Sequence, residues 1–414
     1  MPNYKLTKRA CYFAYLAMSS VFCLPALLFT TFRETFGISY TLLGTLVLVN
    51  FCTQLAIDLV FSFFSRFFNI KLTVRVMPLL TALGLTVYAL VPTFFPDFAY
   101  GGLVIGTVIF SVASGLCEVL LSPTVAALPS KTPERDMSML HSLYAWGVLL
   151  VVGVSTLFLQ LFGTERWAFL VLFWAALPIV SSVLFCLSPM PDMELSHPEG
   201  GKTAGKRHFA MTLCVLCIFL GSAAENSMTN WISAYIESAL GISKALGDIL
   251  GLALFALLLG VTRTLYAKYG KNIVRFLLVS MSGAAVCYLV VGFSQSAVLS
   301  MIACVLTGIC TSMLWPGSLI MMEENLPGMG VAAYALMAAG GDFGASVAPQ
   351  LLGFVVDTVS ASSLATELAL KLSLTPEQVG MKAGMLVASV FPILGTLLLV
   401  YICRYFKKNK TAVA

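Results

Sequence analysis

The sequence predicts an all-α protein that crosses a membrane many times, and three observations support this fold class. Hydrophobic residues make up 59% of the chain and charged residues 10%, with a mean hydropathy of +0.94, whereas soluble domains carry about 25% charged residues. The apolar residues fall into runs of roughly 20, enough for a helix to cross about 30 Å of hydrocarbon. The second half of the chain also repeats the first. Because unpaired backbone groups are costly in lipid, we expect every run to be helical.

Twelve apolar runs are long enough to span a bilayer. The first follows Lys5, Lys8 and Arg9, as the core of a signal peptide would. It is longer than such a core and leads at once into another span, so we expect it to be a retained helix. The expected spans are 10–32, 39–64, 74–95, 99–123, 138–161, 167–187, 208–236, 243–266, 272–293, 296–320, 330–356 and 382–403.

The placement of the 24 Lys and Arg residues predicts the orientation. With the N-terminus in the cytoplasm, nearly all of them lie in cytoplasmic segments, as the positive-inside rule requires. An outward N-terminus would reverse this asymmetry, so we expect both termini in the cytoplasm and the protein in an inner or plasma membrane. The basic residues expected on the outer side are Arg33, Arg166, Lys244, Lys371 and Lys382.

An internal repeat relates the two halves. Residues 114–123 recur as residues 307–316, and the same spacing carries Gly147 to Gly340 and His141 to Tyr334. Six spans, an even number, precede the second copy, so both copies have the same orientation. Parallel repeats of this kind build the major facilitator fold, with a solute site between the halves. We therefore expect two six-helix bundles at 1–187 and 209–414, joined by a polar, Pro- and Gly-rich cytoplasmic linker at 188–208.

Two sequence motifs add a family resemblance. Residues 65–71 keep the basic positions, including Arg66, of the Gly-x-x-x-Asp-Arg-x-Gly-Arg-Lys motif that follows the second helix of major facilitator proteins. Residues 260–271, which include Arg263, keep more of the second-half copy. The chain thus resembles the major facilitator superfamily along nearly its whole length. The resemblance implies that Arg66 and Arg263, together with Asp58, act in a gate or charge lock.

A finer resemblance is to the fucose–proton symporter family of sugar transporters. Its fourth-helix acid followed by Asn-Pro is matched by Glu118 with residues 122–123, where Ser replaces Asn. Its seventh-helix Gly-x-x-x-Glu, then Trp and Tyr, is matched by Gly221, Glu225, Trp231 and Tyr235. Residues 140–147, which contain His141 and Tyr144, are similar to the start of its fifth helix. The acid that couples the proton in that family's first helix has no counterpart here.

Acids within membrane spans are the first candidates for function, because an ionisable side chain in hydrocarbon costs roughly 2.5–3.5 kcal/mol on insertion scales. Glu118 has Thr311 at the equivalent repeat position, so the shared scaffold does not require the acid. Glu225 is followed by Asn226 and by Trp231, whose ring suits stacking on a sugar as well as packing at the membrane interface. Asp342 lies in a segment of small residues suited to close helix packing. We expect Glu118, Glu225 and Asp342 to couple protons.

Further candidates complete the expected site. His141 lies near the expected cytoplasmic end of the fifth span, and a histidine there suits a proton shuttle or a helix cap. Trp315 precedes Pro316, where a helix break would expose backbone in a cavity wall. We expect the solute-binding residues to be Glu118, Glu225, Asn226, Trp231, His141, Tyr144 and Trp315.

These features predict a proton-coupled secondary transporter of a small, polar, sugar-like solute, working by alternating access. The alternatives are efflux of amphipathic compounds, which the 12% aromatic content favours, and a non-transporting sensor or scaffold. We expect no ATP coupling, because the sequence has no phosphate-binding loop. We also expect no enzymatic activity and no cofactor, since the three His residues lie far apart in the sequence and two of them fall in the expected linker. We also expect no metal and no nucleic-acid partner, and a monomer surrounded by membrane lipid.

Overall fold

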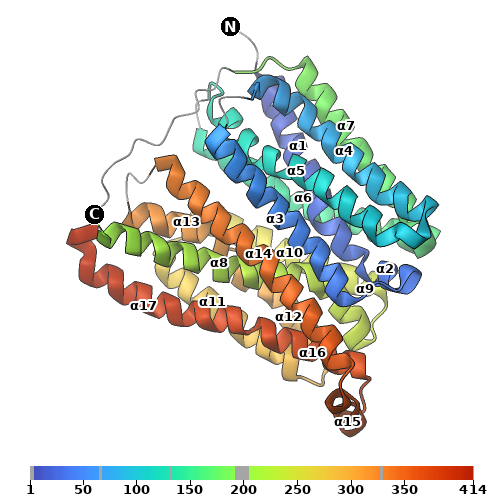
Figure 1. Ribbon diagram of the computed structural model, residues 1–414. Coiled ribbons are helices and arrows are strands. Elements are labelled where there is room, and N and C mark those ends of the chain that lie inside the picture. The colour runs from blue at the N-terminus through green and yellow to red at the C-terminus, as the bar shows by residue number, and fades with distance from the viewer. Residues whose placement is uncertain (1–3, 65–67, 131–132, 192–204, 327–329, 414) are drawn as a thin grey trace. The chain divides into compact units, whose positions relative to one another are not determined.

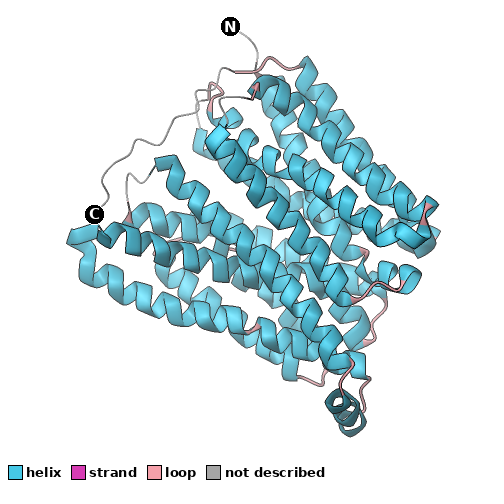
Figure 2. Cartoon of the chain, in the orientation of Figure 1, coloured by secondary structure: helices cyan, strands magenta, loops and turns pink. Residues whose placement is uncertain are grey.

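The computed structural model describes residues 4–64, 68–130, 133–191, 205–326 and 330–413 (Figure 1). These described residues form helices and loops, with no strand among them (Figure 2). Twelve helices are long and apolar enough to cross a membrane, and each overlaps one of the twelve expected spans. The all-α, twelve-span fold is therefore confirmed. The chain divides into two compact units, Met1–Ile38 with Val49–Leu195, and Ser39–Leu48 with Ser196–Ala414.

The first unit is built from seven α-helices and two short 3-10 turns. The break between its first two helices falls at Leu28, shortly after Pro25. The helix that begins at Tyr40 is shared, because its first turns group with the second unit. The elements are α1 (Lys5–Leu27), α2 (Phe29–Phe36), α3 (Tyr40–Phe64), α4 (Ile70–Phe94), η2 (Pro96–Phe98), α5 (Ala99–Ala126), α6 (Pro133–Phe162), η3 (Thr164–Arg166) and α7 (Trp167–Leu187).

The second unit contains ten α-helices, and two of its spans include a π-helical segment. Single π-helical turns inside α-helices frequently lie at functional sites. The elements are α8 (Gly205–Ala234), η4 (Tyr235–Ala239), α9 (Lys244–Gly247), η5 (Asp248–Ala253), α10 (Leu254–Tyr269), α11 (Ile273–Phe293), α12 (Ala297–Thr311), α13 (Leu314–Asn325), α14 (Gly330–Ser360), α15 (Ser363–Leu372), α16 (Pro376–Ala388) and α17 (Val390–Val413).

Helix ends differ from the expected spans where polar residues continue a helix. The last span was expected to end at residue 403, but α17 continues to Val413. Most of the expected linker, residues 192–204, lies outside the described residues, and α8 begins within the rest of it at Gly205. The short helix α15 was not expected. It lies across the ends of α14 and α16 (Figure 1), with Ala365 and Ala369 packed against Val379.

Small residues allow close approach between neighbouring helices in each unit. In the first unit, a Cβ built on Gly84 of α4 would lie 2.5 Å from the backbone nitrogen of Phe110 on α5. In the second, a Cβ on Gly344 of α14 would lie 2.2 Å from the carbonyl oxygen of Phe219 on α8. Lipid gives helices no hydrophobic reason to associate, so such close backbone packing contributes much of the bundle stability.

An ion pair ties the beginning of α1 to the beginning of α6. Lys8 Nζ pairs with Asp136 Oδ1, and Ser130 Oγ donates to Asp136 Oδ2 at 2.6 Å. The Lys8 ammonium and the Ser130 hydroxyl hold the pKa of the Asp136 carboxyl below its usual value. This clasp fixes the N-terminal ends of both helices within the first unit.

The contact between α4 and α5 makes a direct test of the packing. We expect Gly84→Ala to lower the melting temperature of the detergent-purified protein, because the new methyl meets backbone atoms and overpacking costs about 1–3 kcal/mol. Gly153→Ala in α6 is the matched control, since a Cβ there meets no atom within 4 Å. Equal melting temperatures for the two variants would contradict the close α4–α5 contact.

Candidate solute and ion site

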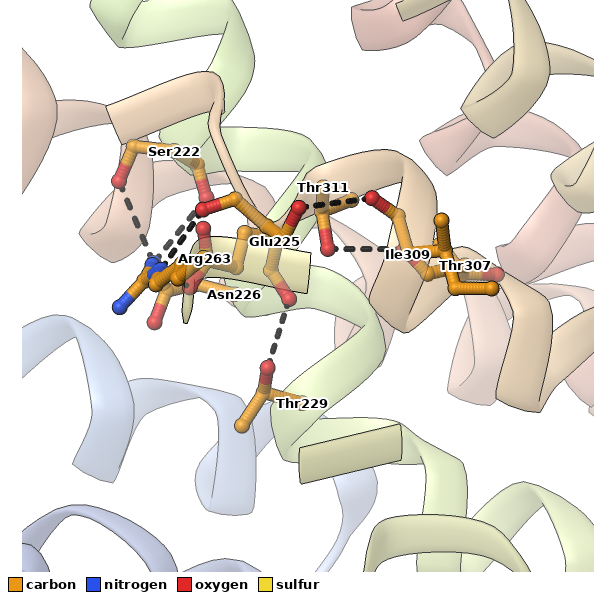
Figure 3. A network of polar contacts seen from close by, with 9 residues as sticks. Ser222, Glu225, Asn226, Thr229, Arg263, Thr307, Ile309 and Thr311 are labelled. Atoms are coloured by element: carbon orange, nitrogen blue, oxygen red, sulfur yellow. Dashed lines mark hydrogen bonds and ion pairs between the residues drawn. The ribbon is translucent and has the colours of Figure 1, made fainter. Parts of the chain in front are cut away.

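A charged pair joins α8 and α10 in the second unit. Arg263 Nη2 donates to Glu225 Oε1 at 3.1 Å (Figure 3). The pair is partly exposed, with 24% of the Arg263 side chain and 15% of the Glu225 side chain accessible. The sequence suggested a solute or proton site for Glu225 and a gate for Arg263. The structure brings these two residues into one site.

The arginine is held in place by a helix break. Pro316 lacks the backbone N–H that would normally bond the carbonyl oxygen four residues earlier, at Ser312. Arg263 Nε donates to that Ser312 oxygen at 2.7 Å, and the normal helical pattern resumes when Gly317 N donates to the Met313 oxygen at 2.8 Å. The guanidinium therefore takes the place of the missing donor and is fixed in orientation.

The glutamate is only half satisfied by this arrangement. Among the described residues, the buried Oε2 atom of Glu225 has no hydrogen-bond partner. A buried polar atom without a partner carries a desolvation cost of roughly 1–3 kcal/mol, and more if it is charged. This oxygen can accept a hydrogen bond from a solute, or carry a proton.

Polar side chains continue along α8 beside the pair. Asn226 Nδ2 donates to the Ser222 carbonyl and hydroxyl oxygens at 3.1 and 3.2 Å, and Thr229 Oγ1 donates to the Glu225 carbonyl at 2.9 Å (Figure 3). Asn230 Nδ2 donates to the Asn226 carbonyl at 2.9 Å. The backbone thus supplies acceptors for these donors, and the partly exposed Asn226 brings an amide next to the charged pair.

Trp315 and Asp342 also belong to the second unit. The Trp315 ring packs on α14 at Gly341, where a Cβ would lie 2.3 Å from ring atom Cζ3. Asp342 is the next residue of α14 and is 3% exposed. The structure therefore brings the indole of Trp315 next to the backbone that carries Asp342.

Trp231 is fully buried, so its ring has no surface open to a solute in this structure. Its Nε1 donates to the Pro349 carbonyl at 3.2 Å, and its ring centroid lies 5.5 Å from that of Tyr40. Tyr40 in turn donates from its hydroxyl to Glu377 Oε1 at 2.6 Å. These contacts build a packed cluster among α8, α14, α16 and the first turn of α3.

Asp357 caps the beginning of α3, which the sequence did not suggest. Its Oδ1 accepts from Tyr40 N at 3.2 Å, and its Oδ2 accepts from Thr41 N and Thr41 Oγ1, both at 2.6 Å. A carboxylate is favourable at a helix N-terminus because it meets unsatisfied N–H groups there. The acid lies in a different span from the helix it caps, so no local sequence pattern marks the contact.

In the first unit, a polar stripe runs between α3 and α5. Asn50 Oδ1 accepts from Gln54 Nε2 at 3.0 Å and from Ser111 Oγ at 2.6 Å, and all three residues are buried. Asn50, Gln54 and Asp58 are spaced four residues apart, so they share one helix face. That spacing was the available signal for this network.

Glu118 lies on α5 one turn beyond Ser114, and its side chain is partly exposed. The buried Ser114 hydroxyl has no partner among the described residues. A partly exposed carboxylate one turn from a hydroxyl without a partner suits a group that exchanges protons. Asp58, at 8% exposure, is more deeply buried.

Three of the expected residues, Tyr144, His141 and Arg66, belong to the first half of the chain. The ring of Tyr144 lies edge-on to Phe22 at 5.6 Å, and its carbonyl accepts from Ser19 Oγ at 3.2 Å. His141 lies in α6, but its side chain is outside the described part of the chain, as is the whole of Arg66. In the residues that the structure describes, no group of three or more His, Cys, Asp or Glu side chains could hold a metal ion.

Three solved structures with closely similar folds are transporters. A bacterial homologue of the human lysosomal transporter Spinster, inward-facing and unoccupied, superposes with a TM-score of 0.75 at 11% identity, covering 97% of each chain. The inward-open xylose transporter XylE from E. coli gives 0.74 at 13% identity, covering 96% of this chain and 95% of that one. The E. coli fucose:proton symporter FucP gives 0.61 at 12% identity, covering 96% and 99%. At these identities the likeness shows the fold alone.

No curated protein matches the chain in sequence. A family model does match, however, and it describes the Major Facilitator Superfamily over residues 10–349. With twelve spans and this match over most of its length, the chain is a multi-pass membrane protein that belongs to the Major Facilitator Superfamily.

Proposed function

We propose that the protein is a proton-coupled secondary transporter that moves a small polar organic solute by alternating access. The observation that carries the proposal is the partly exposed Glu225–Arg263 pair. Burying two charges costs several kcal/mol per ion before their attraction is counted. Residues 37–39 recur as residues 241–243, an offset of 204 in this part of the repeat, and by this offset the equivalent first-half residues are Val21 and Leu59. The scaffold common to both halves therefore does without the pair, which favours a role in transport.

Proton coupling involves Glu118 in the first unit and Glu225 in the second, with Asp342 as a third ionisable group. Glu118 is partly exposed and has Thr311 at its repeat position. A carboxyl group in low dielectric gains a proton more readily than one in water. It can then take up a proton from one side of the membrane and give it up on the other.

The solute is polar and sugar-like in size, and Glu225, Asn226 and Trp315 are its binding candidates in the second unit. Efflux of amphipathic compounds is the alternative, and it differs in requiring an apolar binding surface. A solute that accumulates only when a proton gradient is imposed on proteoliposomes supports the proposal. Transport that does not depend on a proton gradient would count against the proposal, and so would a failure to transport any solute.

We place both termini and the linker at residues 188–208 in the cytoplasm, with the protein in the cell membrane. In a variant without native cysteines, Ser196→Cys should resist impermeant thiol reagents in intact cells. Ala361→Cys, in the exposed turn between α14 and α15, is the matched control and should be labelled. The reverse labelling pattern would overturn this orientation.

Glu118→Gln tests coupling in the first unit. We expect the variant to lose uphill accumulation of solute and to keep counterflow, because an amide cannot carry the proton but has nearly the same shape. Glu367→Gln removes an acid from the exposed Glu367–Lys371 pair of α15 and should behave like the wild type. Loss of accumulation and counterflow together would instead assign Glu118 to solute binding or folding.

A further inference from the structure

The contact between Glu225 and Arg263 is one-sided. A glutamate and an arginine can form two parallel hydrogen bonds when the pair is built as a permanent lock. Here one bond is present, from Nη2 to Oε1 at 3.1 Å, and the buried Oε2 has no partner among the described residues. An ionised Glu225 is therefore poorly satisfied, whereas a protonated one would leave no buried charge unpaired on the acid.

The arginine is anchored independently of the glutamate. Its Nε donates to the Ser312 carbonyl at 2.7 Å, a bond in which Glu225 takes no part. That anchor fixes the plane of the guanidinium, whose terminal nitrogen Nη2 makes the single bond to Glu225. When that bond opens, the planar guanidinium offers two terminal nitrogens in the geometry that matches a carboxylate.

We propose that Arg263 binds the carboxylate of a small organic anion, and that protonation of Glu225 releases Arg263 to do so. The inference rests on the proposed transport function and specifies its solute class. Glu225 takes one proton from solution, its ion pair with Arg263 breaks, and the solute carboxylate takes its place. The neighbouring Asn226 amide and the Trp315 ring suit the hydroxyl-bearing or carbon part of such a solute.

The other titratable groups that pack against α8 either lie at a different height along the helix from Glu225 or already have hydrogen-bond partners. From α11, the Tyr288 hydroxyl donates to the Ala224 carbonyl at 2.7 Å. From α14, Asp342 lies next to Phe343, whose ring packs on Phe219, more than a turn from Glu225. Nearer the other end of α8, Asp248 bonds Ser233 and pairs with Lys244, and Lys382 lies over the Tyr235 ring. Among the described residues, Arg263 is the charged side chain that contacts Glu225, and Glu225 is the group whose protonation frees it.

The test uses the purified full-length protein and matched pairs of probes. Gluconate, glucuronate and lactate are each compared with their neutral amides by the rise in melting temperature and by equilibrium binding. We expect at least one carboxylate to bind while its amide does not. Its affinity should increase up to about tenfold for each unit by which the pH falls, as linkage to one proton requires.

Variants of Glu225 and Arg263 separate proton binding from carboxylate binding. Glu225→Gln mimics the protonated acid, so carboxylate binding should become strong and independent of pH. Arg263→Lys keeps the charge but loses the planar fork, and we expect binding to weaken about 10–100-fold, the scale of one charged hydrogen bond. Arg263→Gln combined with Glu225→Gln leaves no uncompensated charge and should fold yet bind no carboxylate. Lys371→Gln, from the exposed pair on α15, is the control.

Three results would overturn the inference: an amide that binds as well as its acid, carboxylate binding that survives in the double variant, or no carboxylate binding to the wild type. If a neutral solute binds and is transported with Arg263 replaced, the solute class is wrong but the proposed transport function stands. If no probe of either kind binds or is transported, both fail.

Discussion

The second bundle depends on how one backbone carbonyl is satisfied. Pro316 removes the donor that Ser312 would have had, and Arg263 supplies another from α10. A bare carbonyl in a membrane interior would cost several kcal/mol, so the break and the arginine require each other. Once the arginine is there, its charge needs an anion, and Glu225 on α8 provides it. Three helices are thus tied together by one guanidinium.

This linkage also explains how a stable bundle can contain a labile charge. The Nε bond goes to a backbone carbonyl that does not titrate, whereas the Nη2 bond goes to Glu225, which we propose exchanges it for a proton. Removing one partner of a buried pair usually costs about 3–5 kcal/mol. When this pair opens, a proton neutralises Glu225 and a solute carboxylate takes its place beside Arg263. A single side chain can therefore hold the fold and take part in a cycle.

The first bundle carries a neutral polar network between two of its helices. Asn50 accepts hydrogen bonds from Gln54 and Ser111 between α3 and α5, and Glu118 lies one turn beyond Ser114 with a partly exposed side chain. The two halves of a pseudo-symmetric scaffold thus carry different chemistry, which the repeat positions Val21, Leu59 and Thr311 already indicate.

The spans and the repeat could be predicted from sequence because both follow from composition and periodicity along the chain. Glu225 could also be singled out as a candidate, since an acid inside an apolar run is costly. Its partner was not, because Arg263 lies in another span and was grouped with the basic residues at the cytoplasmic end. The same holds for Asp357 and Tyr40, which meet only in three dimensions. For Trp231 the sequence allowed either stacking on a sugar or packing at the membrane interface. Its complete burial depends on packing against Tyr40, which no local sequence pattern encodes.

The central claim is that Glu225 exchanges its bond to Arg263 for a proton while solute is carried. The most direct measurement is the pH change outside proteoliposomes, without an imposed gradient, when a solute that binds the wild type is added. The account predicts that solute entry makes the outside more alkaline for the wild type. It predicts a smaller change per solute carried for Glu225→Gln, because Glu118 remains as the other proton-coupling group. Solute entry without proton uptake by the wild type, or undiminished proton uptake by Glu225→Gln, would contradict it.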